Sequence, residues 1–177
     1  MTRIASDPKI PGIGGLMTFR PETGVPLRKL AEALLRGPSP LSRGERELIA
    51  AFVSSLNGCR FCTRSHAAFA AAQLEGGRPL VDAVLAGDAR AALSSKMRVL
   101  LRVAHAIQRG CDQLEDALVE EARAEGTSDI ELHDTVLIAA AFCMFNRYVD
   151  GLAATTPDAP EVYVAMADLI TTKGYDR

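Results

Sequence analysis

Apolar residues recur at every third or fourth position through most of this chain, which is the spacing of one face of an α-helix. No segment combines sustained apolar–polar alternation with the β-branched residues that strands favour. The pattern predicts helices over residues 27–36, 42–56, 59–75, 81–86, 94–110, 112–125 and 128–152, and a last one that starts near 158. We therefore predict an all-α fold of about seven or eight helices joined by short loops.

Four of these helices begin with a serine or aspartate that precedes a glutamate by three residues. In this arrangement the first side chain caps one free backbone amide of the helix, and the glutamate caps another. We expect capping boxes at Ser42–Glu45, Asp112–Glu115, Ser128–Glu131 and Asp158–Glu161. Pro160 would lie in the first turn of the last helix, where a proline is tolerated.

Prolines and glycines set the first 25 residues apart from the rest. Prolines stand at positions 8, 11 and 21, and a Gly-Ile-Gly-Gly cluster occupies 12–15. This composition is typical of non-helical chain. We predict a mostly non-helical arm over residues 1–25, lying against the body or a neighbouring subunit, and a single helical domain over residues 26–177.

Composition narrows the class of protein. The chain has 177 residues, of which 48% are hydrophobic, so it can bury a core of its own. A net charge of −2 without a basic run argues against nucleic acid as a partner. No stretch approaches the roughly 20 apolar residues that cross a membrane, and the first residues lack the apolar segment of a signal peptide. We expect a cytoplasmic protein that does not bind membranes.

The cysteines provide the first candidate chemistry. Four are present, and Cys59 and Cys62 form a CxxC pair directly after the turn signal Asn57-Gly58. In a reducing cytosol such a pair is more often redox-active or metal-binding than a structural disulfide. Cys111 and Cys143 stand alone, and we expect them to be buried free thiols.

A helix over 59–75 places Cys59, Cys62 and His66 on one face. Free amides at a helix start stabilise a thiolate, so we expect one of the two thiols to have a pKa well below the ordinary value of about 8.5. His66 follows Cys62 by one turn and can accept or relay its proton. On the preceding helix, Glu47 lies on a face of small residues and can approach Cys62 and His66 if the two helices pack together. The four residues would then supply a base, a nucleophile, a resolving thiol and a proton relay.

Two other interpretations of the CxxC pair stay open at this point. The cysteines can be small core residues of a packed helix face, or they can bind zinc together with His66. Zinc is disfavoured because the three candidate ligands share one helix and no second ligand pair follows downstream.

Other polar residues on the predicted helices have less specific explanations. His105 and His133 have no partner at helical spacing that demands chemistry, so we expect structural roles. Asp134, Asn146, Arg147 and Asp150 lie on a mostly apolar helix, where they either form a buried network or line an oligomer interface. A surface pair of Arg147 with Asp150 is the simpler alternative.

The spacing of Glu47, eleven further residues, Cys59-x-x-Cys62 and then His66 resembles the motif of alkylhydroperoxidase D (AhpD). The segments 53–62, 126–134 and 145–150 resemble the peroxidase-related branch of the carboxymuconolactone decarboxylase superfamily. The resemblance spans roughly residues 25–170. It implies an AhpD-like all-α domain, usually in a homo-oligomer, with a peroxide-reducing thiol site and neither a metal nor a cofactor.

The resemblance also implies roles for the site residues of a thiol-dependent peroxidase or disulfide oxidoreductase. Cys62 would attack a hydroperoxide and become a sulfenic acid, and Cys59 would resolve it as a disulfide. Glu47 and His66 would draw the proton from Cys62. An external dithiol, of thioredoxin-like or lipoyl type, would reopen the disulfide. The chain departs from the AhpD motif at Phe61, where active AhpD enzymes carry a second histidine, so the resemblance supports the thiol pair more firmly than the peroxide.

Two other functions are alternatives. One is a non-redox enzyme of carboxymuconolactone decarboxylase type, whose chemistry would not need the CxxC pair. The other is an oligomeric redox-sensing or scaffold protein, which the Pro/Gly-rich arm and the alanine-rich helices favour because both suit subunit packing.

Overall fold

The computed structural model describes residues 2–110 and 112–176, and over this part of the chain it contains helices and no strand. The helices are α1 (Gly12–Phe19), α2 (Pro21–Arg36), α3 (Arg43–Leu56), α4 (Arg60–Ala71), α5 (Gly77–Leu85), α6 (Ser95–Arg109), α7 (Asp116–Ala124), α8 (Asp129–Gly151) and α9 (Pro160–Lys173). The all-α prediction is confirmed. These residues form nine helices, one more than the upper predicted number, because α1 was not expected.

The prediction that residues 1–25 are mostly non-helical is wrong. Residues 12–19 form α1, and α2 begins at Pro21, a first-turn position where the missing N–H has no helical partner. The glycines serve close packing instead of loop formation: a Cβ on Gly24 would lie 2.1 Å from the carbonyl oxygen of Met17. Leu16 and Met17 are buried, so α1 contributes to the core.

The predicted boundary between an arm and a helical domain falls inside α2. The division of the chain into residues 1–25 and 26–177 therefore stays a prediction, although the first part is largely helical.

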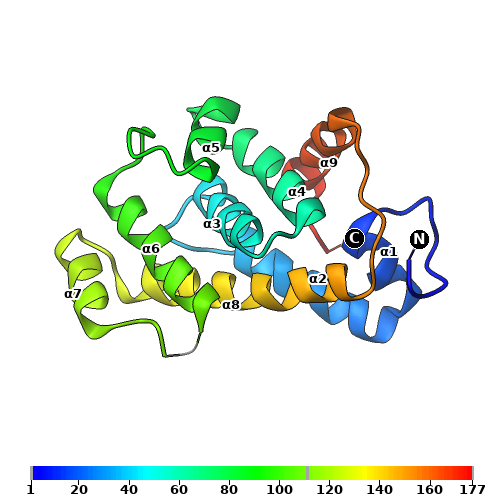
Figure 1. Ribbon diagram of the computed structural model, residues 1–177, viewed down its shortest axis with the longest axis horizontal. Coiled ribbons are helices and arrows are strands. Elements are labelled where there is room, and N and C mark those ends of the chain that lie inside the picture. Colours follow the sequence, from blue (N-terminus) through cyan, green and yellow to red (C-terminus); the bar gives the residue numbers. More distant parts are fainter. Residues whose placement is uncertain (1, 111, 177) are drawn as a thin grey trace.

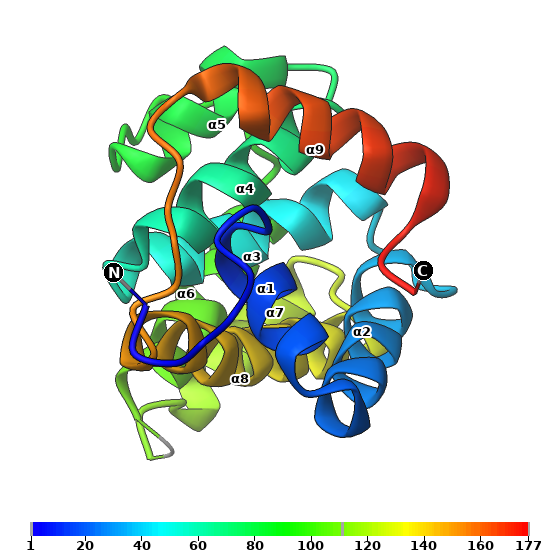
Figure 2. The ribbon, with the colours of Figure 1, turned by 90° about the vertical axis from the view of Figure 1, so that its right-hand side faces the viewer.

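Three layers can be followed in the ribbon. The long helix α8 runs along the base of the view in Figure 1, and α3 packs on it. Helix α4 packs on α3, and α9 packs on the far side of α4, so that α3 and α4 lie between α8 and α9 in Figure 2. This order places the start of α4, with both motif cysteines, inside the molecule.

Two groups of buried apolar side chains hold these layers together. The larger one joins α2, α3, α6 and α8 and includes Leu35, Leu48, Leu100 and Ile138. The smaller one lies between α4, α8 and α9 and contains both cysteines of the motif, with Phe61, Phe69, Val149, Tyr163, Ala167 and Ile170. Alanines on the facing sides of α3 and α4, among them Ala50, Ala67 and Ala70, are buried and let the two helices come close.

Two of the four predicted capping boxes are present. Ser42 with Glu45 and Ser128 with Glu131 form both reciprocal bonds at the starts of α3 and α8. Ser94 caps α6 through the amide of Met97, as expected for a helix that starts at 94 or 95.

The predictions of capping boxes at Asp112–Glu115 and Asp158–Glu161 are wrong. Helix α7 starts at Asp116 and α9 at Pro160, and neither has a side-chain cap. The aspartates have other partners: Asp112 accepts a hydrogen bond from Gln113, and Asp158 pairs with Arg60 and Arg64. The proline prediction is confirmed, because Pro160 is the first residue of α9.

The boundary between α4 and α5 also differs from its prediction. Helix α4 ends at Ala71 instead of residue 75, because the amide of Gln73 bonds to the carbonyl of Ala70, three residues back, and so interrupts the i→i−4 series. Helix α5 starts at Gly77 instead of residue 81. In the described part of the chain, no helix combines the length and the apolar character needed to span a membrane.

Candidate functional site

The turn between α3 and α4 places the first cysteine at the start of a helix. Gly58 adopts a φ of +72°, a conformation that favours glycine, and the amide of Cys59 then donates to the carbonyl of Ser54. Cys59 is the N-cap residue of α4, and Cys62 lies in its first turn. Both thiols are buried, with exposed fractions of 0% for Cys59 and 3% for Cys62.

The two thiols contact each other. A hydrogen bond with Cys59, followed in size by burial, raises the pKa of the Cys62 thiol far above its ordinary value. A hydrogen bond from Asn146 acts in the opposite direction but is outweighed. The sequence suggested a lowered pKa for one of the two thiols, and Cys62 is not that thiol. Cys62 therefore keeps its proton at rest, and a reaction at this sulfur needs a base.

Glu47 and His66 form the charged part of the site. Across the α3–α4 interface, Glu47 Oε2 lies 2.6 Å from His66 Nδ1. The Glu47 residue is 1% exposed, and the side chain of His66 is 12% exposed. The expected approach of Glu47 to His66 is confirmed; the structure records no hydrogen bond between Glu47 and either thiol among the described residues.

This contact determines which nitrogen of His66 can act. When Nδ1 carries a proton and donates it to Glu47, Nε2 of the neutral ring is the free acceptor. Two aromatic rings pack against the imidazole edge-on, Phe142 at 4.6 Å and Phe69 at 5.2 Å between ring centroids. The imidazole is thus held by a carboxylate on one side and by apolar rings on others, which is the arrangement of an oriented base.

Tyr175 is a site residue that the sequence did not indicate. Its hydroxyl donates to Glu47 Oε1 at 2.6 Å, and its ring lies nearly parallel to that of His66, with 15° between the planes. No spacing links it to the motif, because it follows α9 at a distance of 128 residues from Glu47. Only the three-dimensional fold brings it there.

Asn146 is a second residue that the sequence did not assign to the site. Its amide nitrogen donates to the Ser54 hydroxyl at 3.0 Å, and its carbonyl accepts from Asn57 at 2.8 Å. Gln108 extends this network by donating to Asn57. Since Asn146 also bonds to Cys62, the network connects α8 to the thiol pair. It lies in the segment 145–150 that carried part of the resemblance, which was the available signal.

Phe61 lies in the same buried apolar cluster as the two thiols. Its ring packs on Tyr163, with centroids 6.2 Å apart, and closely against Gly12 of α1. A phenyl ring cannot carry a proton, so His66 and Glu47 form the charged pair without a second histidine. Among residues 2–110 and 112–176, no cluster of His, Cys, Asp or Glu is arranged as a metal site.

The remaining polar candidates divide between surface and interior. His105 and His133 are exposed, and Arg147 and Asp150 are exposed on α8. Asp134 accepts a hydrogen bond from Ser39, which joins α8 to the loop before α3. The prediction of a buried network is therefore confirmed for Asn146 alone.

Cys111 and Cys143 were both expected to be buried free thiols. Cys143 is a free, half-buried thiol that accepts a hydrogen bond from Asn57. Cys111 lies outside the described residues.

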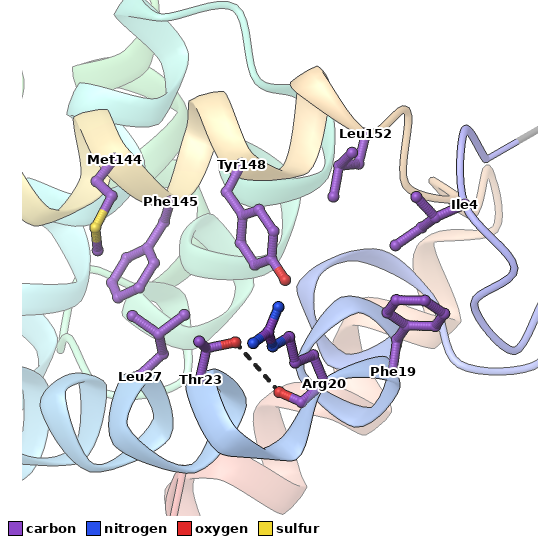
Figure 3. A pocket seen from close by; sticks show the side chains of 9 residues that line it. All are labelled: Ile4, Phe19, Arg20, Thr23, Leu27, Met144, Phe145, Tyr148 and Leu152. Atoms are coloured by element: carbon purple, nitrogen blue, oxygen red, sulfur yellow. Dashed lines mark hydrogen bonds between the residues drawn. The ribbon is translucent and has the colours of Figure 1, made fainter.

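A cavity of about 510 Å³ lies along α8, and neither thiol lines it. The N-terminal segment, α1, α2 and α8 line it, as Figure 3 shows, mostly with apolar side chains such as Phe19, Leu27, Met144 and Phe145. None of the four motif residues reaches it. Phe145 connects the cavity to the candidate site, because its ring also packs against Phe142, the neighbour of His66.

Three solved structures have a similar architecture. An uncharacterized peroxidase-related protein from Silicibacter sp. TM1040 is 28% identical and has a TM-score of 0.79, over 89% of this chain and 80% of that one. A peroxidase-related protein from Ralstonia eutropha JMP134, described as an alkylhydroperoxidase AhpD core, is 24% identical, with the same TM-score and coverage. A protein of unknown function from Agrobacterium tumefaciens is 20% identical, with a TM-score of 0.72, over 90% of this chain and 100% of that one.

The comparison with curated proteins finds no match. The sequence model of the carboxymuconolactone decarboxylase family matches residues 21–85 and 78–157, a range that includes α2 to α8 and all four motif residues. With the AhpD-like fold, this match shows that the chain belongs to the carboxymuconolactone decarboxylase family.

Proposed function

We propose that this protein is a thiol-dependent peroxidase or disulfide oxidoreductase of AhpD type, with Cys59 and Cys62 as its redox pair. The observation that carries the proposal is the pairing of two contacting thiols with an oriented imidazole one turn further along the same helix. In addition, the Silicibacter protein, at 28% identity, is described as peroxidase-related. The electrons pass between thiols and substrate, so the reaction needs no resident cofactor.

The first step is attack of the Cys62 sulfur on the terminal oxygen of a hydroperoxide ROOH. A sulfur–oxygen bond forms and the oxygen–oxygen bond breaks, which leaves a sulfenic acid on Cys62. The thiol proton passes through His66 to the leaving oxygen, so that the alcohol ROH departs. The peroxide is reduced by two electrons, and the Cys62 sulfur is oxidised by two.

In the second step, the Cys59 sulfur attacks the sulfur of the sulfenic acid. A disulfide forms, and hydroxide leaves with the Cys59 proton as water. The two cysteines lie in the same buried cluster, and their closeness before the reaction supports this step. An external dithiol, of thioredoxin-like or lipoyl type, then reduces the disulfide by thiol–disulfide exchange and becomes oxidised itself.

The raised pKa of Cys62 means that Glu47 and His66 must act together as a base. The thiol is protonated at rest, so the attack requires a base at the moment of reaction. His66 Nε2 is the proposed acceptor of that proton. Glu47 holds Nδ1 and stabilises the imidazolium that forms, since its carboxylate lies 2.6 Å away.

A homo-oligomer is part of the proposal. Ile130, Leu137 and Met144 are exposed on α8 at intervals of seven residues, so they share one face of the helix. Such a stripe suits packing against a second copy. Light scattering of the reduced and oxidised protein tests this, and also tests the alternative of a redox-controlled scaffold, which requires the oligomer size to differ between the two states. We also propose that the protein works in the cytoplasm, where dithiol reductants are available.

The family match favours a second candidate, a non-redox enzyme of carboxymuconolactone decarboxylase type. Turnover of hydroperoxide with an external dithiol separates the two. The peroxidase proposal expects catalytic alcohol formation by the reduced protein and none by the Cys59→Ser/Cys62→Ser double variant. Decarboxylation of a lactone substrate that survives in the double variant would favour the second candidate.

A further inference from the structure

Tyr175 and His66 bind opposite oxygens of one carboxylate. The Tyr175 hydroxyl donates to Glu47 Oε1 and His66 Nδ1 lies at Oε2, both at 2.6 Å. Glu47 is almost completely buried, and a buried carboxylate is costly unless donors surround it. The phenol therefore supplies a donor that solvent cannot.

The backbone around Tyr175 is fixed by groups outside the thiol site. Its amide donates to Glu32 Oε2 of α2 at 2.7 Å, and Arg36 holds Glu32 while donating to the carbonyl of Ile170 near the end of α9. Gly174 adopts a φ of +80°, and a Cβ there would lie 2.5 Å from the Glu32 carboxylate. The glycine thus lets the chain pass over Glu32 and turn the ring toward Glu47.

The phenol also keeps its proton. Burial, followed by the neighbouring charge of Glu47, raises the pKa of Tyr175 well above its ordinary value. It remains a donor over the whole pH range in which a histidine titrates. The Tyr175 ring lies 6.4 Å from that of His66, between ring centroids, and is nearly parallel to it.

We infer that Tyr175 is a positioning residue of the thiol site: its hydroxyl fixes the Glu47 carboxylate so that Oε2 faces His66 Nδ1 and Nε2 is left as the base. The inference rests on the proposed function for its kinetic consequence, but the geometric effect on His66 does not depend on peroxide. A phenol that merely anchors the chain after α9 would change stability without changing the titration of His66.

Tyr175→Phe is the variant that separates these roles, because it removes the hydroxyl and keeps the ring. Tyr163→Phe is the matched control: the Tyr163 hydroxyl also donates a hydrogen bond, to the backbone carbonyl of Pro157, but none to Glu47. Nitrogen-15 NMR of the histidine rings follows the protonation and tautomer of His66, whose signal is assigned with His66→Gln.

Without the phenol, the carboxylate has one donor fewer and attracts the imidazole proton more strongly. We expect the midpoint of the His66 titration to rise in Tyr175→Phe and to stay unchanged in Tyr163→Phe. The rate of Cys59–Cys62 disulfide formation with hydroperoxide is expected to fall about tenfold in Tyr175→Phe, with its pH profile displaced in the same direction.

A second variant tests the same effect without removing the phenol. Glu32→Gln keeps the phenol but weakens the charge that holds the Tyr175 amide, so a smaller shift in the same direction is expected. Unchanged His66 titrations in both Tyr175→Phe and Glu32→Gln would overturn the inference. If the wild-type protein forms no disulfide with peroxide, the proposed function fails, whereas the NMR titration still decides the role of Tyr175.

Discussion

Glu47 Oε2 and His66 Nδ1 lie 2.6 Å apart across the interface of α3 and α4, although the two residues are 19 positions apart in the chain. Buried alanines at this interface allow the approach, and the carboxylate is closed off from solvent. In the proposed mechanism this buried carboxylate orients the imidazole. This relationship leads to the first prediction.

Glu47→Gln removes the charge that orients His66 while keeping the size of the side chain. We expect the rate of hydroperoxide reduction to fall about 100-fold, because the imidazolium loses its stabilising partner. Stopped-flow measurement of disulfide formation checks this. Glu131→Gln is the control, since Glu131 is also buried and ion-paired, with Lys96, but is not bonded to any residue of the thiol site. Equal rates in Glu47→Gln and the wild type would remove Glu47 from the mechanism.

The raised pKa of Cys62 predicts a loss of stability in alkaline solution. The folded state keeps the thiol proton where the unfolded chain, with an ordinary thiol pKa of about 8.5, has released it. The stabilisation is therefore fully present below about pH 8.5 and declines above it, by up to about 1.4 kcal/mol per pH unit. Chemical denaturation of the reduced protein at pH 7, 8, 9 and 10 measures the slope. In Cys62→Ala this contribution should vanish, and an unchanged slope would show that the thiol is not the source.

Asn146 provides a test of the network that reaches the thiols. Its hydrogen bond favours the ionised form of Cys62, so Asn146→Ala should slow alkylation of Cys62 by iodoacetamide. The lost bonds to Ser54 and Asn57 should cost about 1–3 kcal/mol of unfolding free energy. Ser54→Ala serves as the control, because it loses a bond to Asn146 but no bond to Cys62. Faster alkylation in Asn146→Ala than in Ser54→Ala would contradict the assignment.

A substitution at Gly12 tests the packing of α1 on α4. Gly12 has a φ of +58°, and a Cβ there would lie 2.1 Å from the ring of Phe61. Gly58 has a φ of +72° with open space around it, so it isolates the backbone strain. Gly58→Ala should lower the unfolding free energy by about 1–2 kcal/mol. Gly12→Ala should lower it by about 1–3 kcal/mol more, because the new methyl group overlaps with Phe61. Equal losses in the two variants, measured by urea unfolding, would show that α1 does not press on Phe61.

The sequence predicted the helical part of the site well, because its signals are local. Capping at Ser42 and Ser128, the turn at Asn57-Gly58 and the spacing of Cys59, Cys62 and His66 all depend on residues within a few positions of one another. The approach of Glu47 to His66 followed from a single further condition, that two neighbouring helices pack through small side chains.

The parts that the sequence did not predict depend on distant contacts. Tyr175 reaches Glu47 from 128 residues away, and no local pattern encodes that approach. The glycines before residue 25 suggested a loop, whereas the fold uses Gly24 for close packing against Met17. The raised pKa of Cys62 comes from burial and from its neighbour Cys59, and the position of this residue in the helix encodes neither of these causes.

The most direct test of the redox proposal is mass spectrometry of the reduced protein after one equivalent of hydroperoxide, with free thiols blocked before unfolding. The wild type should show one disulfide linking Cys59 and Cys62, and one equivalent of alcohol. Cys59→Ser should instead retain a trappable sulfenic acid on Cys62. If both thiols remain free and the peroxide is unconsumed, the protein is not a thiol peroxidase; if the sulfenic acid forms on Cys59 in Cys62→Ser and not on Cys62 in Cys59→Ser, the roles of the two cysteines are reversed.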